Sequence, residues 1–484
     1  MRRRAVVVGA GIAGLAAAYR LDRLAKQRGL DLELVVLESG ARAGGVIDST
    51  RRDDCLLELG PDSIITEKPW ARALCEEIGL GDRIIGTSPD CRQSFVALGN
   101  TLHPIPEGFY MMAPSRLTPF VKTSLFSLAG KARMALDLVL PRRSTDTDES
   151  LGDFVRRRLG REALERAAQP MVGGVYTADP DKLSLRATMP RFLEMERKHR
   201  SLILAMVAAR RRAAGGAGGA AAEGSAAGPR YSLFISLDKG LSVLPERLCE
   251  LLPAGALRTR TMVERIERND TPGSARWSVH TLGERIDADA VCLATPAHAG
   301  ARIIESAAPE LARSLNGIDY ASSATVNLVY RRKDIPHALD GFGFVVPAVE
   351  KRTLLACTFS SVKYAGRAPA DKVLIRAFVG GALFPEAYEM PDERMTTGIR
   401  KDLGDLLCVR AAPSDVVISR WPRSMPQYNV GHLERVAHIQ DEAGRLPGFA
   451  LAGAAFGGVG IPDSVRSGET AAERLVTDLA RGSG

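Results

Sequence analysis

Residues 5–27 read AVVVGAGIAGLAAAYRLDRLAKQ. Residues 5–8 are apolar and rich in β-branched side chains, which predicts a buried parallel strand. Residues 12–27 place apolar side chains on one side, which predicts a helix. A second apolar run, LELVVL at residues 32–37, predicts another strand. The start of the chain is therefore a predicted β-α-β unit.

Three glycines join the first strand to the helix in the pattern G-x-G-x-x-G. Gly9 permits the tight turn, Gly11 lets a pyrophosphate approach the backbone, and Gly14 lets helix and strand pack closely. The helix N-terminus then offers free N–H groups to phosphates. Glu38 lies 24 residues after Gly14, at the end of the second strand, where a carboxylate binds ribose hydroxyls. The spacing predicts a dinucleotide site, against the alternative of a structural glycine turn. The remaining positions of the predicted site are Ile12 and Ala13.

Length and composition restrict the class of protein. At 484 residues the chain is too long for one hydrophobic core, so two or three domains are expected. The net charge of +8 suits an ordinary solvated surface, an acidic substrate or an anionic membrane surface. Nucleic acid is disfavoured because no basic run is interleaved with aromatic residues. No run reaches the ~18–20 apolar residues that span a bilayer, so we expect a soluble or peripheral protein.

The cysteines and the N-terminus bear on the compartment. Seven cysteines are scattered without a C-x-x-C pair, which argues against a disulfide framework and a zinc site and for a reducing cytoplasm. Residues 2–18, basic and then apolar, also have the outline of a signal peptide, but the glycine spacing favours the nucleotide unit. No Ser-His-Asp set, H-E-x-x-H motif or close carboxylate pair appears. We therefore predict no catalytic side chain and no metal ligand.

The rest of the chain alternates in character. Residues 70–80 and about 120–215 carry helical periodicity, and the low-complexity tract at 213–228 predicts a flexible surface loop. Residues 449–475 predict a strand, a glycine-rich turn and a helix. This order predicts a nucleotide domain built from separated segments, with other domains inserted. Strand signals stand at 231–235, 261–266, 290–293, 325–330, 342–346, 354–359 and 373–379.

Two further motifs follow Glu38. SGARAGG at residues 39–45 and ELGPDS at residues 58–63 resemble the E-x-x-x-R-x-G-G and L-G-P motifs of the amine oxidase-like FAD superfamily. The resemblance implies that FAD is the cofactor and that Arg42, with its neighbouring glycines, lies against pyrophosphate and flavin. It also implies that the backbone at Val263 contacts adenine. The cofactor positions implied here are Ser39, Arg42, Gly44, Gly45, Gly60, Pro61, Asp62, Ser63 and Val263.

The C-terminal stretch LAGAAFGGVGIPDS at residues 451–464 is rich in small residues. Small residues let the backbone approach a planar ring, and a helix that starts here points its N-terminus at the flavin pyrimidine edge. The alternative is a glycine-rich loop without a ligand. The predicted cofactor positions are Gly453, Val459, Gly460, Ile461, Pro462 and Ser464.

QPMVGGVYTADP at residues 169–180, GFGFVVP at residues 341–347 and the closing GVGIPD resemble the signature of oxygen-dependent porphyrinogen oxidases. The resemblance spans nearly the whole chain. It implies a heme-biosynthetic enzyme in which FAD removes six hydrogens from a porphyrinogen, two at a time, while oxygen becomes hydrogen peroxide. The substrate-binding positions that it implies are Gly174, Phe342, Val345 and Phe378.

One position departs from the family pattern. Members that act on protoporphyrinogen IX often carry an arginine where this chain has Ser94, and Arg92 is the candidate replacement. Residues 104–108, 117–126 and 128–135 look more like the bacterial branch that oxidises coproporphyrinogen III. Its four propionates suit a basic protein, so coproporphyrinogen III is slightly preferred and protoporphyrinogen IX stays open.

The predicted fold is α/β and α+β. A discontinuous Rossmann-type FAD-binding domain (1–66, 232–300 and 435–484) carries an inserted mixed-sheet substrate domain (301–434) and a helical domain (95–215), with a flexible loop at 216–231. By resemblance the helical domain faces a membrane peripherally, on the inner face of the cell membrane, and a homodimer is left open. The alternatives are another flavin amine oxidase or carotenoid desaturase-like enzyme, and a binding protein related to Rab GDP-dissociation inhibitors.

Overall fold

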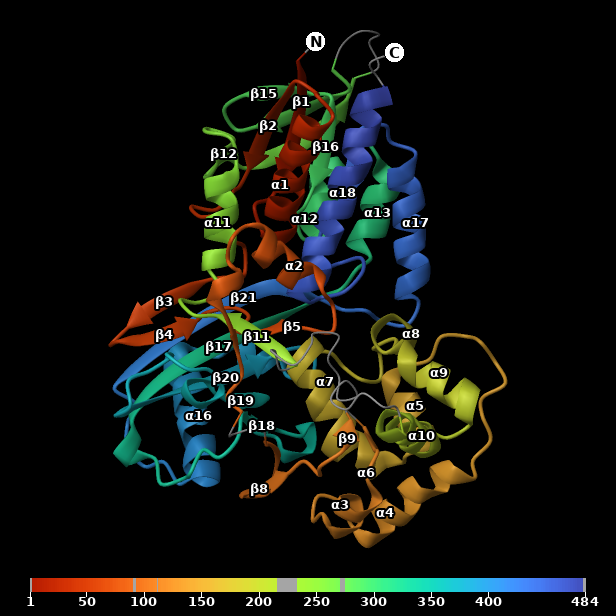
Figure 1. The fold of residues 1–484 in the computed structure, drawn as a ribbon, viewed down its shortest axis with the longest axis vertical. Coiled ribbons are helices and arrows are strands. Elements are labelled where there is room, and N and C mark those ends of the chain that lie inside the picture. Colours follow the sequence, from red (N-terminus) through yellow and green to blue (C-terminus); the bar gives the residue numbers. More distant parts are fainter. Residues whose placement is uncertain (1, 90–92, 111, 216–232, 270–274, 482–484) are drawn as a thin grey trace.

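The computed structural model describes residues 2–89, 93–110, 112–215, 233–269 and 275–481. Figure 1 shows three parts: an α/β part at the top with both ends of the chain, a mixed sheet at the lower left and a helical region at the lower right. The fold is a mixed α/β fold with one parallel sheet and one mixed sheet.

A five-stranded parallel sheet forms the upper part, in the order β12-β2-β1-β16-β22. Its middle strand β1 is buried because alternate side chains enter two cores: Ala5 and Val7 pack with one layer, and Val6 and Val8 with the other. The predicted segments 12–27, 32–37 and 290–293 are confirmed to the residue. The strands are β1 (Arg3–Val8), β2 (Leu32–Leu37), β12 (Leu257–Arg258), β16 (Ala290–Leu293) and β22 (Phe449–Leu451).

Helices and a small sheet cover the two faces of the parallel sheet (Figure 1). One face carries α1 (Ile12–Gln27), α11 (Val243–Leu251) and α18 (Ile461–Arg481). The last helix therefore runs beyond the predicted end at 475. The other face carries α12 (Ala297–Ile304), α13 (Pro309–Asn316), α17 (His432–Gly444) and the antiparallel strands β13 (Val263–Arg268), β14 (Trp277–Thr281) and β15 (Arg285–Ala288).

A seven-stranded mixed sheet forms the lower left part, in the order β21-β17-β20-β19-β18-β7-β8. One face packs on α16 (Asp392–Leu407) through an apolar core. The last two strands of this order, β7 and β8, fall in the predicted helical domain, but β7 pairs in parallel with β18. The strands are β7 (Ser94–Leu98), β8 (Thr101–Pro104), β17 (Tyr320–Arg331), β18 (Gly343–Val345), β19 (Ala356–Phe359), β20 (Lys372–Gly380) and β21 (Asp415–Pro426).

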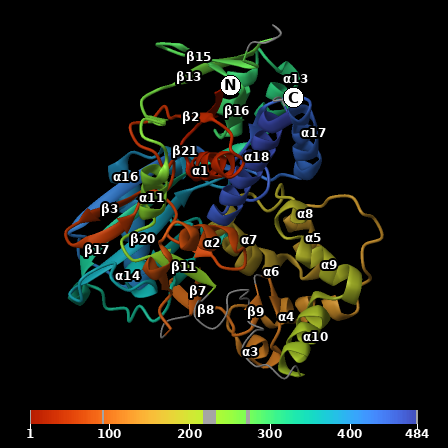
Figure 2. The same ribbon diagram turned by 45° about the horizontal axis from the view of Figure 1, so that its top comes forward.

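Short elements connect the two sheets. They form a hairpin, β3–β4, and a three-stranded sheet, β5-β11-β6. The hairpin packs on β17 and β20 of the mixed sheet, and Figure 2 shows β3 beside β17. These elements are β3 (Ser49–Arg52), β4 (Cys55–Glu58), β5 (Ile64–Ile65), β6 (Ile84–Gly86), β11 (Phe234–Leu237), α2 (Trp70–Glu77) and η1 (Gly81–Arg83). Four other short helices follow strands of the mixed sheet: η4 (Arg332–Asp334), η5 (Ala348–Glu350), α14 (Ser360–Lys363) and α15 (Pro385–Glu389).

The helical region forms its own apolar core. Serine side chains start three of its helices: the hydroxyls of Ser127, Ser150 and Ser184 each accept a backbone N–H three residues later, at 3.0 Å. The elements are β9 (Phe109–Tyr110), β10 (Ala113–Pro114), α3 (Leu117–Lys122), α4 (Leu128–Ala135), η2 (Leu136–Leu138), α5 (Leu151–Arg158), α6 (Arg161–Ala163), η3 (Leu164–Ala168), α7 (Gln169–Tyr176), α8 (Leu185–Thr188), α9 (Pro190–His199) and α10 (Leu202–Gly215).

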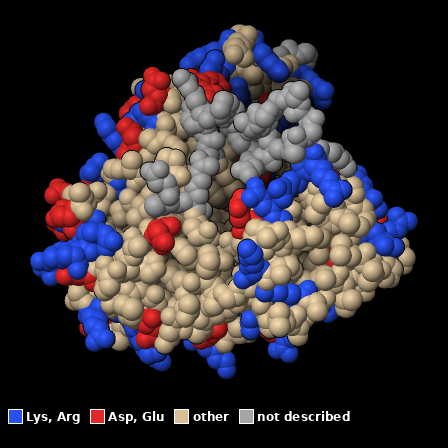
Figure 3. All heavy atoms as spheres, turned by 60° about the horizontal axis from the view of Figure 1, so that its bottom comes forward, with Lys and Arg blue, Asp and Glu red and all other residues tan. Residues whose placement is uncertain are grey.

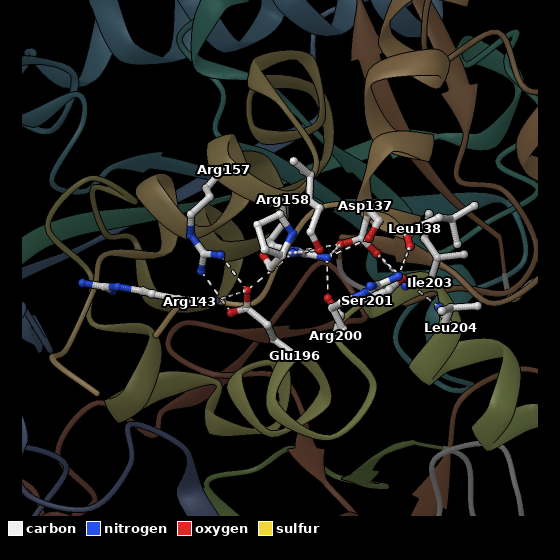
Figure 4. Close-up of polar contacts among 12 residues, drawn as sticks. Asp137, Leu138, Arg143, Arg157, Arg158, Glu196, Arg200, Ser201, Ile203 and Leu204 are labelled. Atoms are coloured by element: carbon white, nitrogen blue, oxygen red, sulfur yellow. Dashed lines mark hydrogen bonds and ion pairs between the residues drawn. The ribbon is translucent and has the colours of Figure 1, made fainter. Parts of the chain in front are cut away.

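A buried ion pair joins four segments of this region (Figure 4). Arg158 and Asp137 are both fully buried, and the Arg158 Nε donates to Asp137 Oδ1 at 2.7 Å. The same guanidinium donates to the Arg200 carbonyl at 2.6 Å and the Pro141 carbonyl at 3.0 Å. Asp137 Oδ2 accepts from the Ser201 hydroxyl at 2.6 Å. Because buried charges need such partners, this pair fixes how η2, α5 and the junction of α9 with α10 sit together.

Candidate functional site

The first glycine turn lies at the carboxyl edge of the parallel sheet, between β1 and α1. Gly9 has φ +99°, and a Cβ there would lie 2.6 Å from the Ala294 carbonyl oxygen. A Cβ on Gly14 would lie 1.9 Å from the Gly9 oxygen, so both positions require glycine. At Gly11 a Cβ would meet nothing within 4 Å, and no side chain caps the helix that follows. The turn therefore leaves open space and unpaired N–H groups where a phosphate would bind.

Glu38 is held rigidly beside this turn. Its carboxylate accepts the Ala10 N–H at 2.8 Å and the Gly40 N–H at 2.7 Å. Its own carbonyl accepts the N–H of Thr261 at 2.8 Å. Val263, buried at the start of β13, follows two residues later, so the predicted ribose and adenine contacts lie at one place.

The second glycine turn packs against the first. The Gly44 N–H donates to the Ala10 carbonyl at 2.8 Å, Gly11 and Gly44 form a parallel bridge, and a Cβ on Gly45 would lie 3.2 Å from the Gly11 Cα. The Arg42 guanidinium donates to the Gly45 carbonyl at 2.8 Å. Arg42 thus shapes its own turn, and its contact with a pyrophosphate stays a prediction. Ser39 lies exposed on the same loop.

The third turn, residues 58–63, is tied to the mixed sheet. Arg376 on β20 donates to the Gly60 carbonyl, and a Cβ on Gly60 would lie 1.7 Å from the Val46 oxygen. Asp62 pairs with Lys363 at 3.2 Å and lies 3.6 Å from Arg376. Burial opposes ionisation, but these two cations hold the pKa of Asp62 well below its usual range.

The side chains of this third turn are already engaged. The Ser63 hydroxyl bonds to Asp62 at 2.7 Å and accepts from Lys363 at 2.7 Å. The Tyr364 hydroxyl is a further partner of Ser63, at 2.8 Å. The backbone around Pro61 is therefore the part of the turn that is left for a ligand.

The C-terminal turn completes this edge of the sheet. It follows β22 and carries positive φ angles at Gly453 (+135°) and Gly458 (+150°). The Ser464 N–H donates to the Gly460 carbonyl at 3.0 Å in the first turn of α18, and Asp463 pairs with Lys68 at 2.7 Å. The other predicted residues here, Val459, Ile461 and Pro462, are half-buried or buried.

Helices α1 and α18 cross closely at this edge. A Cβ on Gly468 would lie 2.2 Å from the Ala13 carbonyl oxygen, so α18 passes the first turn of α1 in backbone contact. The four glycine turns therefore converge around the carboxyl ends of β1, β2 and β22. Such an edge is where open α/β sheets bind nucleotides.

A second predicted surface lies on the mixed sheet. Val345, Ala356 and Phe378 are directly paired across β18, β19 and β20, so their side chains share one face. A Cβ on Gly174 of α7 would lie 3.8 Å from the Val345 Cγ1. The structure thus brings Gly174, Val345 and Phe378 together. Phe342 is half-buried and precedes the paired part of β18, which starts at Gly343, so the strand pairing does not show on which face of the sheet its ring lies. Arg92 lies outside the described residues.

Sequence reasoning missed three residues of these surfaces. Arg376 is buried, and its guanidinium lies 4.7 Å from the centre of the Phe378 ring. The sequence could have predicted Arg376, because side chains two residues apart on a strand lie on the same face and Arg376 stands two residues before Phe378. Lys68 and Tyr428 belong to no quoted motif, and nothing in their spacing points to the C-terminal turn.

The described residues offer neither a metal site nor a membrane-spanning helix. In this part of the chain, no group of three His, Cys, Asp or Glu side chains is placed to hold a metal ion. No helix within the described ranges is long and apolar enough to cross a membrane. Six of the cysteines are described, and each is a free thiol; Cys91 lies outside.

Comparison with known proteins adds an independent line of evidence. Residues 12–476 match the family model described as flavin containing amine oxidoreductase. A Bacillus subtilis coproporphyrinogen III oxidase is 35% identical over 99% of both chains, and one from Propionibacterium freudenreichii is 37% identical over 97% of this chain and 90% of that protein. A solved Exiguobacterium structure described as a protoporphyrinogen oxidase superposes with a TM-score of 0.84 at 32% identity over 99% of both chains.

Proposed function

The chain belongs to the flavin-containing amine oxidoreductases, and from that premise we propose that it is an FAD-dependent porphyrinogen oxidase of heme biosynthesis with coproporphyrinogen III as its substrate. The observation that carries the proposal is the full-length similarity to coproporphyrinogen III oxidases. The geometry supports it, because a nucleotide-binding edge and an apolar sheet face occur in one molecule.

The residues at the sheet edge fit FAD. We propose that residues 1–66, 232–300 and 435–484 hold it in a Rossmann-type domain, to which α12 and α13 also belong because they pack on the same sheet. The unpaired N–H groups after Gly11 suit the pyrophosphate, Glu38 the ribose and the backbone at Val263 the adenine. When bound, FAD supplies a two-electron acceptor that oxygen restores with release of hydrogen peroxide.

The protein's own contribution is to bind and orient the substrate. The face with Val345, Ala356 and Phe378 is an apolar surface for a tetrapyrrole, and Gly174 leaves room beside it. Arg376 is a buried cation next to Phe378, which adds positive charge to this wall. Six hydrogens leave the porphyrinogen while three O2 become three H2O2, so the overall reaction balances without a further oxidant.

Ser94 supports coproporphyrinogen III over protoporphyrinogen IX. It starts β7 and pairs in register with Gly343, which pairs in turn with Thr358 and then Arg376. Ser94 is therefore on the same face of the sheet as Arg376 and Phe378, which is the proposed substrate face. A serine there gives no cation for a single propionate, whereas a substrate with four propionates can use charges elsewhere on a basic protein.

The assay for this proposal is oxygen uptake by the purified, FAD-loaded protein with each porphyrinogen prepared anaerobically. We expect three O2 consumed per porphyrin formed and faster turnover of coproporphyrinogen III. Reduction of the flavin by an amine or a polyene, with no reaction of either porphyrinogen, would instead place the chain among other members of its family. A purified protein that holds no flavin would favour a binding protein.

We also propose that the helical region contacts a membrane surface from the cytoplasmic side. Five large apolar side chains between residues 117 and 139 are exposed, among them Leu128 with 85% of its surface accessible. In Figure 3 the half of the lower face formed by this region carries many more Lys and Arg than Asp and Glu. Apolar groups among basic ones favour anionic lipid. Absence of co-sedimentation with liposomes, with and without anionic lipid, would remove this part of the proposal.

A further inference from the structure

Tyr428 stands where the three parts of the molecule meet. It lies in the short segment between β21 and α17 and is 2% exposed. Its carbonyl accepts the Ser184 N–H of the helical region at 2.8 Å. The next residue but one, Val430, donates its N–H to the Lys182 carbonyl at 2.8 Å. The backbone of this segment is thus fixed against the helical region, and the position of the Tyr428 ring with it.

The Tyr428 hydroxyl spans the C-terminal glycine turn. It accepts the Gly458 N–H at 2.8 Å and donates to the Ala454 carbonyl at 2.5 Å. One oxygen therefore joins two backbone groups four residues apart in a turn that has few side chains of its own. Gly458 has φ +150°, a conformation open to glycine but rarely to other residues, so the turn has no side chain at this position to fix it.

The surroundings keep this phenol neutral and in place. Burial raises the pKa of Tyr428 far above its usual range. The ring stacks on His432, with 4.0 Å between centroids and 14° between planes. Burial, with Arg435 nearby, lowers the pKa of His432 to about 4, so the stack carries no charge at neutral pH.

The location of the turn connects Tyr428 to the cofactor edge. The C-terminal glycine turn joins β22 to α18. Helix α18 in turn packs against the N-terminal end of α1, where Gly468 approaches Ala13. Any ligand at the carboxyl edge of the parallel sheet that reaches the N-terminus of α18 must lie against residues 453–460. The shape of that backbone therefore sets how such a ligand is seated.

We propose that Tyr428 is a positioning residue for the flavin: its hydroxyl holds the Gly453–Gly460 turn in the conformation that receives the cofactor. The inference rests on the proposed binding of FAD. It adds a residue outside every glycine motif, acting through the backbone of the turn rather than through contact with the substrate.

The test compares Tyr428→Phe with the wild type and with Tyr330→Phe, each prepared as the full chain without flavin and titrated with FAD. Y428F removes only the hydroxyl and keeps the ring stack. Tyr330 is a matched control because it is equally buried but lies in the core between the mixed sheet and α16. Flavin fluorescence gives the dissociation constant, and the midpoint potential of the bound flavin is measured in parallel.

We expect Y428F to weaken FAD binding about tenfold, which corresponds to ~1.4 kcal/mol, and to shift the potential, while Y330F leaves both unchanged. Equal FAD affinity and potential in Y428F and wild type would overturn the inference and leave the proposed function standing. A wild-type chain that binds no FAD would overturn both.

A second measurement needs no variant. Hydrogen exchange of the flavin-free wild type should show a protected Gly458 amide, because Tyr428 holds the turn before the cofactor arrives. Rapid exchange at Gly458 that slows only when FAD is added would show that the cofactor orders the turn, and would overturn the inference.

Discussion

Replacing Asp137 with alanine tests the buried ion pair of the helical region (Figure 4). The change removes the nearer anion of the fully buried Arg158 and leaves it only Glu196, 3.5 Å from its Nη1; the Ser201 hydroxyl and the Ile203 N–H also lose their acceptor. Removing one partner of a buried pair costs about 3–5 kcal/mol. The remaining Glu196 carboxylate offsets only part of this loss, because it already pairs with Arg157 at 2.6 Å.

Thermal unfolding followed by circular dichroism measures this loss. For a region of this size, 3–5 kcal/mol corresponds to a fall of roughly 12–20 °C in Tm at ~4 °C per kcal/mol. Glu165→Ala is the matched control, because the Arg161–Glu165 pair lies in the same region with Arg161 82% exposed. Exposed pairs contribute about 0–1 kcal/mol, so its Tm should hardly change. Equal shifts in D137A and E165A would refute the reasoning.

Four further outcomes are expected. Gly14→Ala places a Cβ 1.9 Å from the Gly9 oxygen and should abolish FAD retention, measured as flavin released on heating; Gly444→Ala at the end of α17, where a Cβ meets nothing within 4 Å, should retain flavin. His432 has a lowered folded pKa of about 4, so between pH 6.5 and 4 the unfolded chain binds the extra proton and stability falls as pH falls, by up to about 3 kcal/mol. Urea unfolding across this range should show a smaller loss in His432→Phe. Ser94→Arg should shift the ratio of kcat/KM values towards protoporphyrinogen IX by about tenfold, about 1.4 kcal/mol, and Ser94→Ala should not. Leu128→Ser should reduce co-sedimentation with anionic liposomes without changing turnover in solution.

The sequence predicted the nucleotide-binding edge well because its signals are local. An apolar run, glycines at fixed spacing and an acid at the next strand end define β1, α1 and β2 within a continuous stretch of chain. The C-terminal turn and α18 were predicted for the same reason. Each of these features depends on neighbours within a few residues.

What the sequence could not predict depends on contacts between distant segments. β7 follows the upper part in sequence but pairs with β18, about 250 residues later, and carries β8 with it. Arg376 looks like a surface residue in sequence, and only the pairing of the Asp62 turn with β20 makes it a buried cation. Tyr428 acts on a turn 26 residues away through one hydroxyl, which leaves no trace in any spacing.

The most direct measurement of the central claim is porphyrin formation in air, followed by fluorescence, from coproporphyrinogen III and protoporphyrinogen IX prepared anaerobically. FAD-loaded protein should form coproporphyrin III faster than protoporphyrin IX, with three H2O2 released per porphyrin. Faster protoporphyrin formation would contradict the proposed role of Ser94 and leave a porphyrinogen oxidase. Formation of both porphyrins at only the non-enzymatic rate would contradict the account itself.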